Sequence, residues 1–195
     1  MKKLIDYLMK HPLIYVLVQN VVNGSGHKRI KKYLKQNIPV NATVLDLGCG
    51  TGEYSLVFKN YTGLDNNPKD IKYAEQKYKG IFMVGDASNM TQIKDNSFDA
   101  VFSVGLHHHL TDEKAKKAII EALRVIKKGG KVIIIDAMFP VHAWNIIGLV
   151  IRKLDRGGYI RQFSNTLKLL PKKIQYSFNM LSTFPLDFIC ITIVK

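Results

Sequence analysis

One run of residues constrains this chain most: Val44-Leu45-Asp46-Leu47-Gly48-Cys49-Gly50-Thr51-Gly52. An apolar stretch that meets an acidic residue and passes into three alternating glycines predicts a β-strand, a sharp turn and then a helix. Glycine adopts backbone dihedrals that are closed to other residues, and it has no Cβ to keep a ligand away from the main chain. We therefore expect a nucleotide-like ligand to lie against this turn.

A dinucleotide-binding turn is the first alternative. Its fingerprint is G-x-G-x-x-G, with a pyrophosphate at the N-terminus of the following helix. Here the spacing is G-x-G-x-G, and Glu53 stands where the third fingerprint glycine would be. Because a carboxylate at a helix start repels a pyrophosphate, the turn favours a ligand that carries no phosphate.

Two more acidic residues end short apolar runs. Tyr61–Asp65 and Ile81–Asp86 each predict a strand that finishes in a carboxylate, and such a carboxylate can accept hydrogen bonds from ribose hydroxyls. In this order, the glycine turn and the two strand ends resemble the cofactor motifs of class I S-adenosylmethionine (SAM)-dependent methyltransferases. The resemblance covers about Asn41 to Asp136 and implies that SAM is the cofactor. It places Asp65 at the ribose, and Asp86 with the backbone of Ala87 at the adenine.

The resemblance also implies a full set of cofactor-binding residues and a fold. The residues are Asp46, Gly48, Gly50, Asp65, Asn66, Asp86, Ala87 and Ser103. The fold is α/β: a doubly wound, seven-stranded sheet, mostly parallel, with a C-terminal antiparallel hairpin. Taken singly, a glycine turn is more often a tight loop and a strand-end aspartate a helix cap, so the inference depends on their joint order.

Periodicity divides the chain into elements of a single domain. Residues 1–40 are expected to form a helical cap, residues 41–137 the SAM-binding core, and residues 138–195 a substrate-side segment with the closing strands. The predicted strands are Thr43–Leu47, Tyr61–Asp65, Ile81–Val84, Asp99–Ser103, Lys131–Ala137, Ile174–Leu181 and Leu186–Val194. The predicted helices are Asp112 to about Lys127, Val141–Ile151, and a short helix capped by Ser164.

The N-terminal segment begins with lysines and apolar residues, but its pattern does not fit a signal peptide. Asp6, Lys10 and Pro12 interrupt it, and no small-residue cleavage site follows. Its apolar run is far shorter than the ~20 residues that a transmembrane helix requires. We expect two short amphipathic helices broken near Pro12, with peripheral membrane contact as an alternative. Cys49 and Cys190 give no disulfide framework and no metal spacing, so a cytoplasmic location without a metal is expected.

The formal charge of +14 is concentrated at the two ends of the chain. Residues 1–39 carry eight basic side chains and one acidic one, residues 152–195 carry eight and two, and the core between them is nearly neutral. Such flanks attract an anionic small molecule, a lipid headgroup or RNA, and a solvated lysine-rich surface is the structural alternative. Nucleic acid is not favoured, because lysines outnumber arginines and aromatic residues are not interleaved with them.

Three consecutive histidines, His107, His108 and His109, follow the fourth predicted strand, where the resemblance places the acceptor site. Histidine titrates near neutral pH and can take a proton from a hydroxyl or protonated amine. Consecutive residues cannot share one helix face. Because many family members carry a His-His pair before an apolar residue here, His108 and His109 before Leu110 are the candidate catalytic residues. Packing or capping is the structural alternative.

Leu154–Arg161 combines turn residues with arginines, whose planar fork binds carboxylate or phosphate through two hydrogen bonds. Arg156, Tyr159 and Arg161 are therefore candidate contacts to the acceptor, and a loop that binds its own carbonyls is equally consistent with the pattern.

The end of the fourth strand lacks the Asn/Asp-Pro-Pro-aromatic element of enzymes that methylate nucleobase amino groups. What remains is a small-molecule or lipid-like acceptor, methylated at oxygen, nitrogen or carbon. Three functions stay open: methyl transfer to such an acceptor, methyl transfer to RNA, and SAM binding without catalysis.

Overall fold

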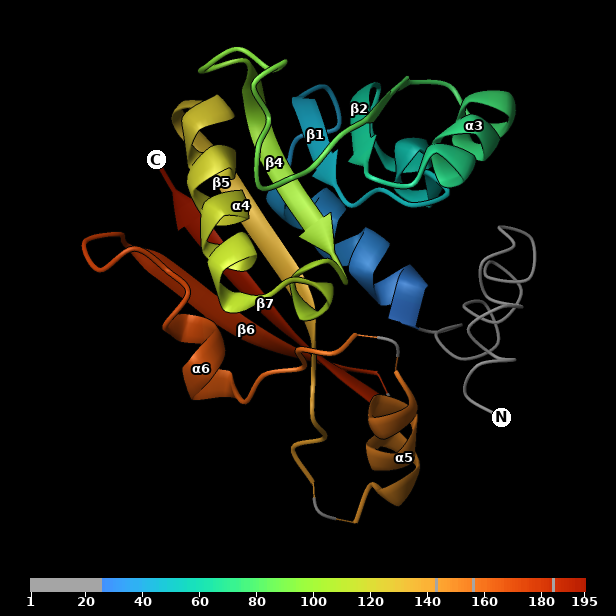
Figure 1. Cartoon of the computed structure of the whole chain (residues 1–195), viewed down its shortest axis with the longest axis vertical. Coiled ribbons are helices and arrows are strands. Elements are labelled where there is room, and N and C mark those ends of the chain that lie inside the picture. The colour runs from blue at the N-terminus through green and yellow to red at the C-terminus, as the bar shows by residue number, and fades with distance from the viewer. Residues whose placement is uncertain (1–25, 143, 156, 184) are drawn as a thin grey trace.

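A seven-stranded sheet forms the centre of the molecule, with the strand order β3-β2-β1-β4-β5-β7-β6 (Figure 1). The computed structural model describes residues 26–142, 144–155, 157–183 and 185–195, so the two helices expected around Pro12 lie outside the described residues. The strands are β1 (Thr43–Leu47), β2 (Asn60–Asp65), β3 (Ile81–Val84), β4 (Phe98–Val104), β5 (Ile126–Met138), β6 (Tyr176–Thr183) and β7 (Leu186–Val194). Strands β1 to β5 pair in parallel, and β7 runs antiparallel between β5 and β6. The predicted α/β fold class, including the C-terminal antiparallel hairpin, is confirmed.

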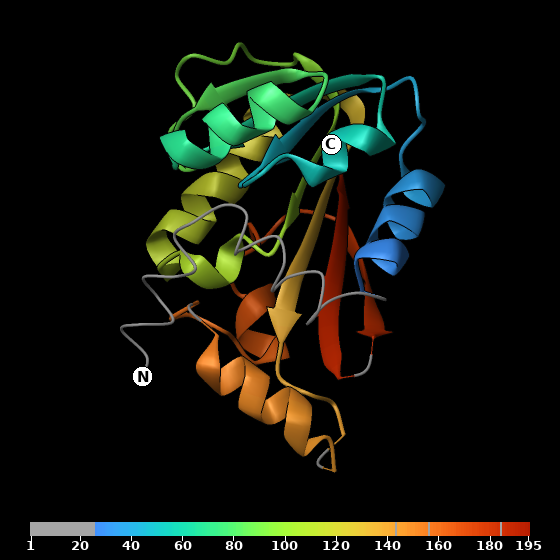
Figure 2. The same cartoon turned by 90° about the vertical axis from the view of Figure 1, so that its right-hand side faces the viewer.

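Helices cover both faces of this sheet (Figure 2). The helices of the described residues are the helix at residues 26–37 and η1 (Glu53–Val57), α3 (Pro68–Lys77), η2 (His107–His109), α4 (Asp112–Val125), α5 (Ile146–Leu154) and α6 (Phe163–Leu167). Neighbouring strand residues face opposite cores: Val101 packs in the core with α4, and Phe102 packs in the core with α3 and the helix at residues 26–37. This alternation follows from the two-residue period of a strand. Among the described residues, no helix combines the length and the apolar content that crossing a bilayer requires.

Local signals set several helix starts. Thr111 caps α4 by accepting a hydrogen bond from the backbone of Lys114. Asn67 caps α3, and Pro68 occupies its first turn, where a missing N–H costs nothing.

Several predicted boundaries were wrong, among them those of β6, which runs from Tyr176 to Thr183 instead of from Ile174 to Leu181. The glycine turn leads into the five-residue 3₁₀-helix η1 instead of a longer helix, because β2 begins at Asn60 and leaves only a few residues between the two strands. Helix α4 ends at Val125, and β5 begins at Ile126 instead of Lys131, because Gly129 and Gly130 lie within the strand and exchange backbone hydrogen bonds with Lys195. Two C-terminal helix starts also differ: Asn145, not a residue before Val141, caps α5 through Gly148, and α6 follows Gln162 without a side-chain cap from Ser164.

Candidate functional site

The carboxyl ends of β1 and β4 lie side by side at the centre of the sheet, with Leu47 opposite Ser103. From β1 the chain continues to β2 on one side, and β4 continues to β5 on the other side. In doubly wound sheets, ligands bind outside the carboxyl ends of the strands at such a reversal of strand order. The predicted cofactor residues lie in the last residues of β1, β2 and β4 or directly after β1, β2 and β3, so the fold brings them to this edge.

The glycine turn needs its glycines for backbone geometry. All three glycines have a positive φ: +72° at Gly48, +50° at Gly50 and +81° at Gly52. Residues with a side chain are strained in this left-handed region of backbone conformation. A Cβ on Gly48 would lie 2.8 Å from Leu106 Cδ1, so the turn packs directly against the segment that follows β4. A Cβ on Gly50 would have no atom within 4 Å. The main chain at Gly50 is therefore open to a ligand.

Asp65 connects the end of β2 to the glycine turn through hydrogen bonds. One carboxylate oxygen accepts the N–H of Gly50 at 2.9 Å, and the other accepts the N–H of Asn67 at 2.8 Å. Each carboxylate oxygen has a second lone pair, so Asp65 can still accept hydrogen bonds from two hydroxyls.

Two buried polar groups lie at the end of the central strands. Asp46 accepts the Tyr61 hydroxyl at 2.7 Å through Oδ2, and its Oδ1 has no hydrogen-bond partner in the described part of the chain. Burial raises the pKa of Asp46 to about 7, although the hydrogen bond from Tyr61 opposes the shift. Ser103 Oγ is also buried without a partner among the described residues. Because unsatisfied buried polar atoms are costly, these two atoms suit a ligand with its own polar groups, as the amino-acid tail of SAM has.

The remaining predicted cofactor residues lie at the ends of β2 and β3. Asp86 accepts hydrogen bonds from the backbone and the hydroxyl of Ser88, and it pairs with Lys114 at 3.2 Å. The hydrogen bonds from Ser88 and the Lys114 ammonium lower the pKa of Asp86, despite partial burial. Ala87 is buried and Asn66 is exposed. Asp86 is therefore ionised and held in place.

The three histidines form η2 and differ sharply in surroundings. His107 and His108 are buried, whereas His109 is exposed. The His109 ring lies against the His108 ring, with 4.2 Å between their centroids. Burial lowers the pKa of His107, whose Nδ1 has no hydrogen-bond partner among the described residues. Only His109 of the three is open to a molecule arriving from solvent.

His108 is held between two carboxylates from distant segments. Its Nδ1 lies 2.6 Å from Asp136 Oδ1, at the end of β5, and its Nε2 lies 3.7 Å from Asp155 Oδ1. Burial by itself would lower the pKa of His108, but the Asp136 carboxylate, with Asp155, outweighs burial and raises it. The same ion pair lowers the pKa of Asp136 against its own burial. The sequence did not reveal Asp136 and Asp155 as the partners of His108. The available signal was that Asp136, like Asp46 and Asp65, is an acidic residue near the carboxyl end of a strand.

The same groups provide a potential set of metal ligands. One ligand atom each from His108, His109 and Asp155 lies within 4.8 Å of the other two. The Arg152 guanidinium already supplies a positive charge 3.5 Å from Asp155 Oδ2, so the cluster is neutralised by the chain itself.

The predicted acceptor contacts have different surroundings. Arg161 donates to the carbonyls of His107 and Leu110 at 2.7 and 2.6 Å, and it pairs with Asp112 at 2.9 Å. A further hydrogen bond reaches the carbonyl of Tyr159, so the guanidinium is occupied by the chain, which favours the alternative of a loop that binds its own carbonyls. The Tyr159 side chain is exposed, and Arg156 lies outside the described residues.

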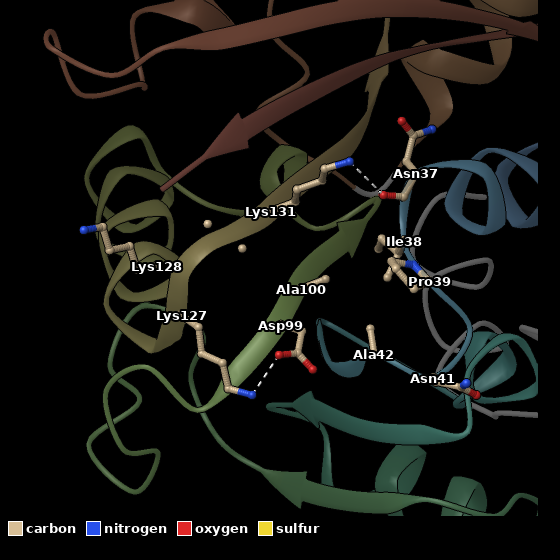
Figure 3. A pocket seen from close by; sticks show the side chains of 12 residues that line it. Asn37, Ile38, Pro39, Asn41, Ala42, Asp99, Ala100, Lys127, Lys128 and Lys131 are labelled. Atoms are coloured by element: carbon tan, nitrogen blue, oxygen red, sulfur yellow. Dashed lines mark hydrogen bonds and ion pairs between the residues drawn. The ribbon is translucent and has the colours of Figure 1, made fainter.

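A cavity of about 530 Å³ lies elsewhere, at the amino ends of the strands (Figure 3). Lys127 and Lys131 border it from the first half of β5, and they bind Asp99 and the carbonyl of Asn37. Because it opens at the edge opposite to the glycine turn, this cavity is not the candidate site.

Comparison with known proteins agrees with this geometry. Residues 45–134 match the family model of a methyltransferase domain. The chain is 35% identical over 102 residues to a tRNA (carboxymethyluridine(34)-5-O)-methyltransferase of Arabidopsis thaliana, which covers 51% of this chain and 25% of the relative. It is 36% identical over 124 residues to a 2-methyl-6-phytyl-1,4-hydroquinone methyltransferase of Synechocystis sp., covering 55% of this chain and 37% of the relative. The chain therefore spans well under two thirds of the length of these relatives.

A solved structure adds the fold over a longer range. A TehB-like SAM-dependent methyltransferase from Corynebacterium glutamicum superposes with a TM-score of 0.64 at 20% identity, covering 85% of this chain and 86% of the other. The sequence match and the fold point to one conclusion, because residues 45–134 are also the segment that carries the glycine turn and its acidic partners. Residues 45–134 are therefore similar to a methyltransferase domain, and the seven-stranded sheet has the class I methyltransferase fold.

Proposed function

We propose that this chain binds SAM at the glycine turn and transfers its methyl group to a small or lipid-like acceptor. The observation that carries the proposal is the open main chain at Gly50, fastened to Asp65 at 2.9 Å, beside the unpartnered oxygen of Asp46. Asp65 would hold the ribose, the region of Asp86 and Ala87 the adenine, and the turn itself the amino-acid tail. When bound, SAM supplies a methyl group on a positively charged sulfur, which is already a good leaving group.

The chain then has to align the acceptor, exclude water and remove a proton where the acceptor is a hydroxyl. His109 is the candidate for the proton, because it is the exposed histidine of η2. His108 is a positioning residue in this proposal: its contact with Asp136 fixes η2 and thereby the direction of His109.

The first experiment is a calorimetric titration with SAM and with S-adenosylhomocysteine, using NADH as the control. Micromolar binding of the first two without NADH binding supports the cofactor. Acceptor screening follows with hydroquinones that carry apolar tails and with other small hydroxyl compounds. In that assay, His109→Ala is expected to lower kcat and to leave SAM affinity unchanged. Absence of SAM binding would overturn the proposal.

Methyl transfer to RNA is the second candidate, favoured by the basic flanks and by the relative that acts on tRNA. This function predicts that the protein binds RNA and that its affinity falls steeply as the salt concentration rises. The reason is that each contact to a phosphate releases counterions, which is less favourable at high salt. SAM binding with no acceptor of either class would instead indicate a non-catalytic SAM-binding module.

A further inference from the structure

The helix α5 presents an unusually apolar surface to solvent. Trp144 is 69% exposed, and Ile146, Ile147 and Val150 are 66%, 58% and 48% exposed. With Leu149 of the same helix, these residues form what we call the α5 surface. Soluble surfaces scatter large apolar side chains singly, whereas a contiguous group of them marks an interaction site.

The orientation of α5 is fixed, so this surface cannot simply turn inward. Arg152 donates to the carbonyls of Met138 and Asp187 at 3.1 and 2.9 Å, and Asn145 donates to the carbonyl of Pro185 at 2.9 Å. With 3.6 residues per turn, Gly148 and Arg152 share the buried side of the helix, and the α5 surface lies on the opposite side.

The free charge on helix α5 is positive. The helix contains no acidic residue, and its two basic residues are Arg152, which is buried and pairs with Asp155 after the helix, and Lys153. Lys153 is exposed in the last turn of α5, and the chain as a whole carries a charge of +14. An apolar helix face that follows an exposed tryptophan and ends in an exposed lysine complements an anionic lipid surface, where apolar side chains enter the interface and lysine reaches the headgroups.

Position connects this surface with the active-site edge. Both views place α5 at one end of the molecule, past the carboxyl ends of the parallel strands (Figures 1 and 2). Helix α5 leads directly into Asp155, which lies 3.7 Å from His108. A membrane in contact with α5 would therefore lie near the candidate acceptor site.

We propose that the α5 surface docks this protein on anionic lipid bilayers. A lipid-like acceptor, which rests on the proposed function above, would be dissolved in the bilayer. Docking would then bring the candidate acceptor site to the membrane that contains the acceptor. The helix has only nine residues, so it would lie in the interface and not cross the bilayer.

The test uses the full chain and Trp144, which is the only tryptophan in the sequence. Tryptophan emission and co-sedimentation are measured with vesicles of phosphatidylcholine alone and with vesicles that contain 30% phosphatidylglycerol as an added anionic lipid. We expect a blue shift and sedimentation with the anionic vesicles, both reduced by salt. Ile147→Asp is expected to lower the partition coefficient at least about tenfold, because an apolar side chain no longer enters the interface. The matched control is Ile120→Asp on α4, where the isoleucine is 56% exposed, against 58% for Ile147.

Three results would overturn the inference. The first is no blue shift with anionic vesicles, and the second is equal losses in the two variants. The third is that Trp144 is already shielded from acrylamide without vesicles, because another part of the protein would then cover the α5 surface. Shielding that depends on protein concentration would identify that cover as a second copy, and shielding that does not would identify it as another segment of the same chain. SAM titration of the same samples separates the two proposals. Vesicle binding without SAM binding contradicts only the proposed function, and SAM binding without vesicle binding contradicts only the docking.

Discussion

The Asp65 carboxylate accepts a hydrogen bond of 2.9 Å from the backbone nitrogen of Gly50, which ties the end of β2 to the middle of the glycine turn. The carboxylate therefore holds the turn, and in the proposed function its remaining lone pairs accept hydrogen bonds from the cofactor. Asp99 gives a natural comparison, because it accepts the backbone N–H of Thr43 at 2.8 Å at the opposite edge of the sheet.

Asp65→Asn should weaken SAM binding by about 1–3 kcal/mol, because a charged acceptor for the ribose hydroxyls is lost while an amide oxygen remains. Calorimetry on this variant and on Asp99→Asn measures the effect. Asp99→Asn should bind SAM as the wild type does. Equal affinity of the wild type and Asp65→Asn would refute the role of Asp65.

Asp46 should make the ligand-free protein less stable as pH rises. Its pKa is about 7 in the folded protein because of burial and near 4 in an unfolded chain. Between these values the folded state binds more protons than the unfolded state, so the free energy of unfolding falls with increasing pH. Asp46→Asn removes the group that titrates and therefore the fall in stability that it causes. At pH 8 the variant should have a free energy of unfolding up to about 4 kcal/mol above that of the wild type, which corresponds to the difference between the two pKa values.

Denaturant unfolding at pH 5 and pH 8 checks this prediction. Tyr61→Phe is the opposite control, since it removes the hydrogen bond that favours the Asp46 carboxylate and should make the fall with pH steeper. If wild type and Asp46→Asn lose stability in parallel, Asp46 does not cause the fall.

His108→Asn should destabilise the fold by about 3 kcal/mol near pH 6, because it leaves the buried Asp136 carboxylate without a cationic partner. The pKa of His108 is raised in the folded protein, so its stabilising effect is full below the unfolded-state value near 6.5 and is lost as pH rises through the folded-state value. The difference from the wild type should therefore be smaller at pH 9. A difference that is independent of pH between these values would argue against the ion pair.

Gly157→Ala should destabilise the protein, whereas Gly158→Ala should have little effect. A Cβ on Gly157 would lie 2.0 Å from His108 Cδ2, whereas a Cβ on Gly158 would have nothing within 4 Å. Overpacking of this kind costs about 1–3 kcal/mol. Thermal unfolding of the two variants compares them directly, and equal melting temperatures would show that Gly157 does not pack on His108 as described.

Several elements follow from local pattern alone. Strands β1, β3 and β7 begin and end where the sequence predicts, since each is an apolar run next to a breaker: Gly48 follows β1, Gly80 and Gly85 flank β3, and Pro185 precedes β7. The start of β5 was missed because Gly129 and Gly130 have the composition of a turn, and only pairing with Lys195 keeps them in a strand. The start of α5 was missed because an apolar run does not reveal which polar residue caps it.

The sequence by itself determined the fold class and the order of the cofactor motifs, because the glycine turn and each acidic residue at a strand end are local patterns of a few consecutive residues. Only the tertiary structure decided which histidines are buried and what Arg161 binds. His108 meets Asp136 across 28 positions, and Arg161 meets the carbonyl of His107 across 54. Such partners depend on how distant segments pack, and periodicity along the chain carries no information about that packing.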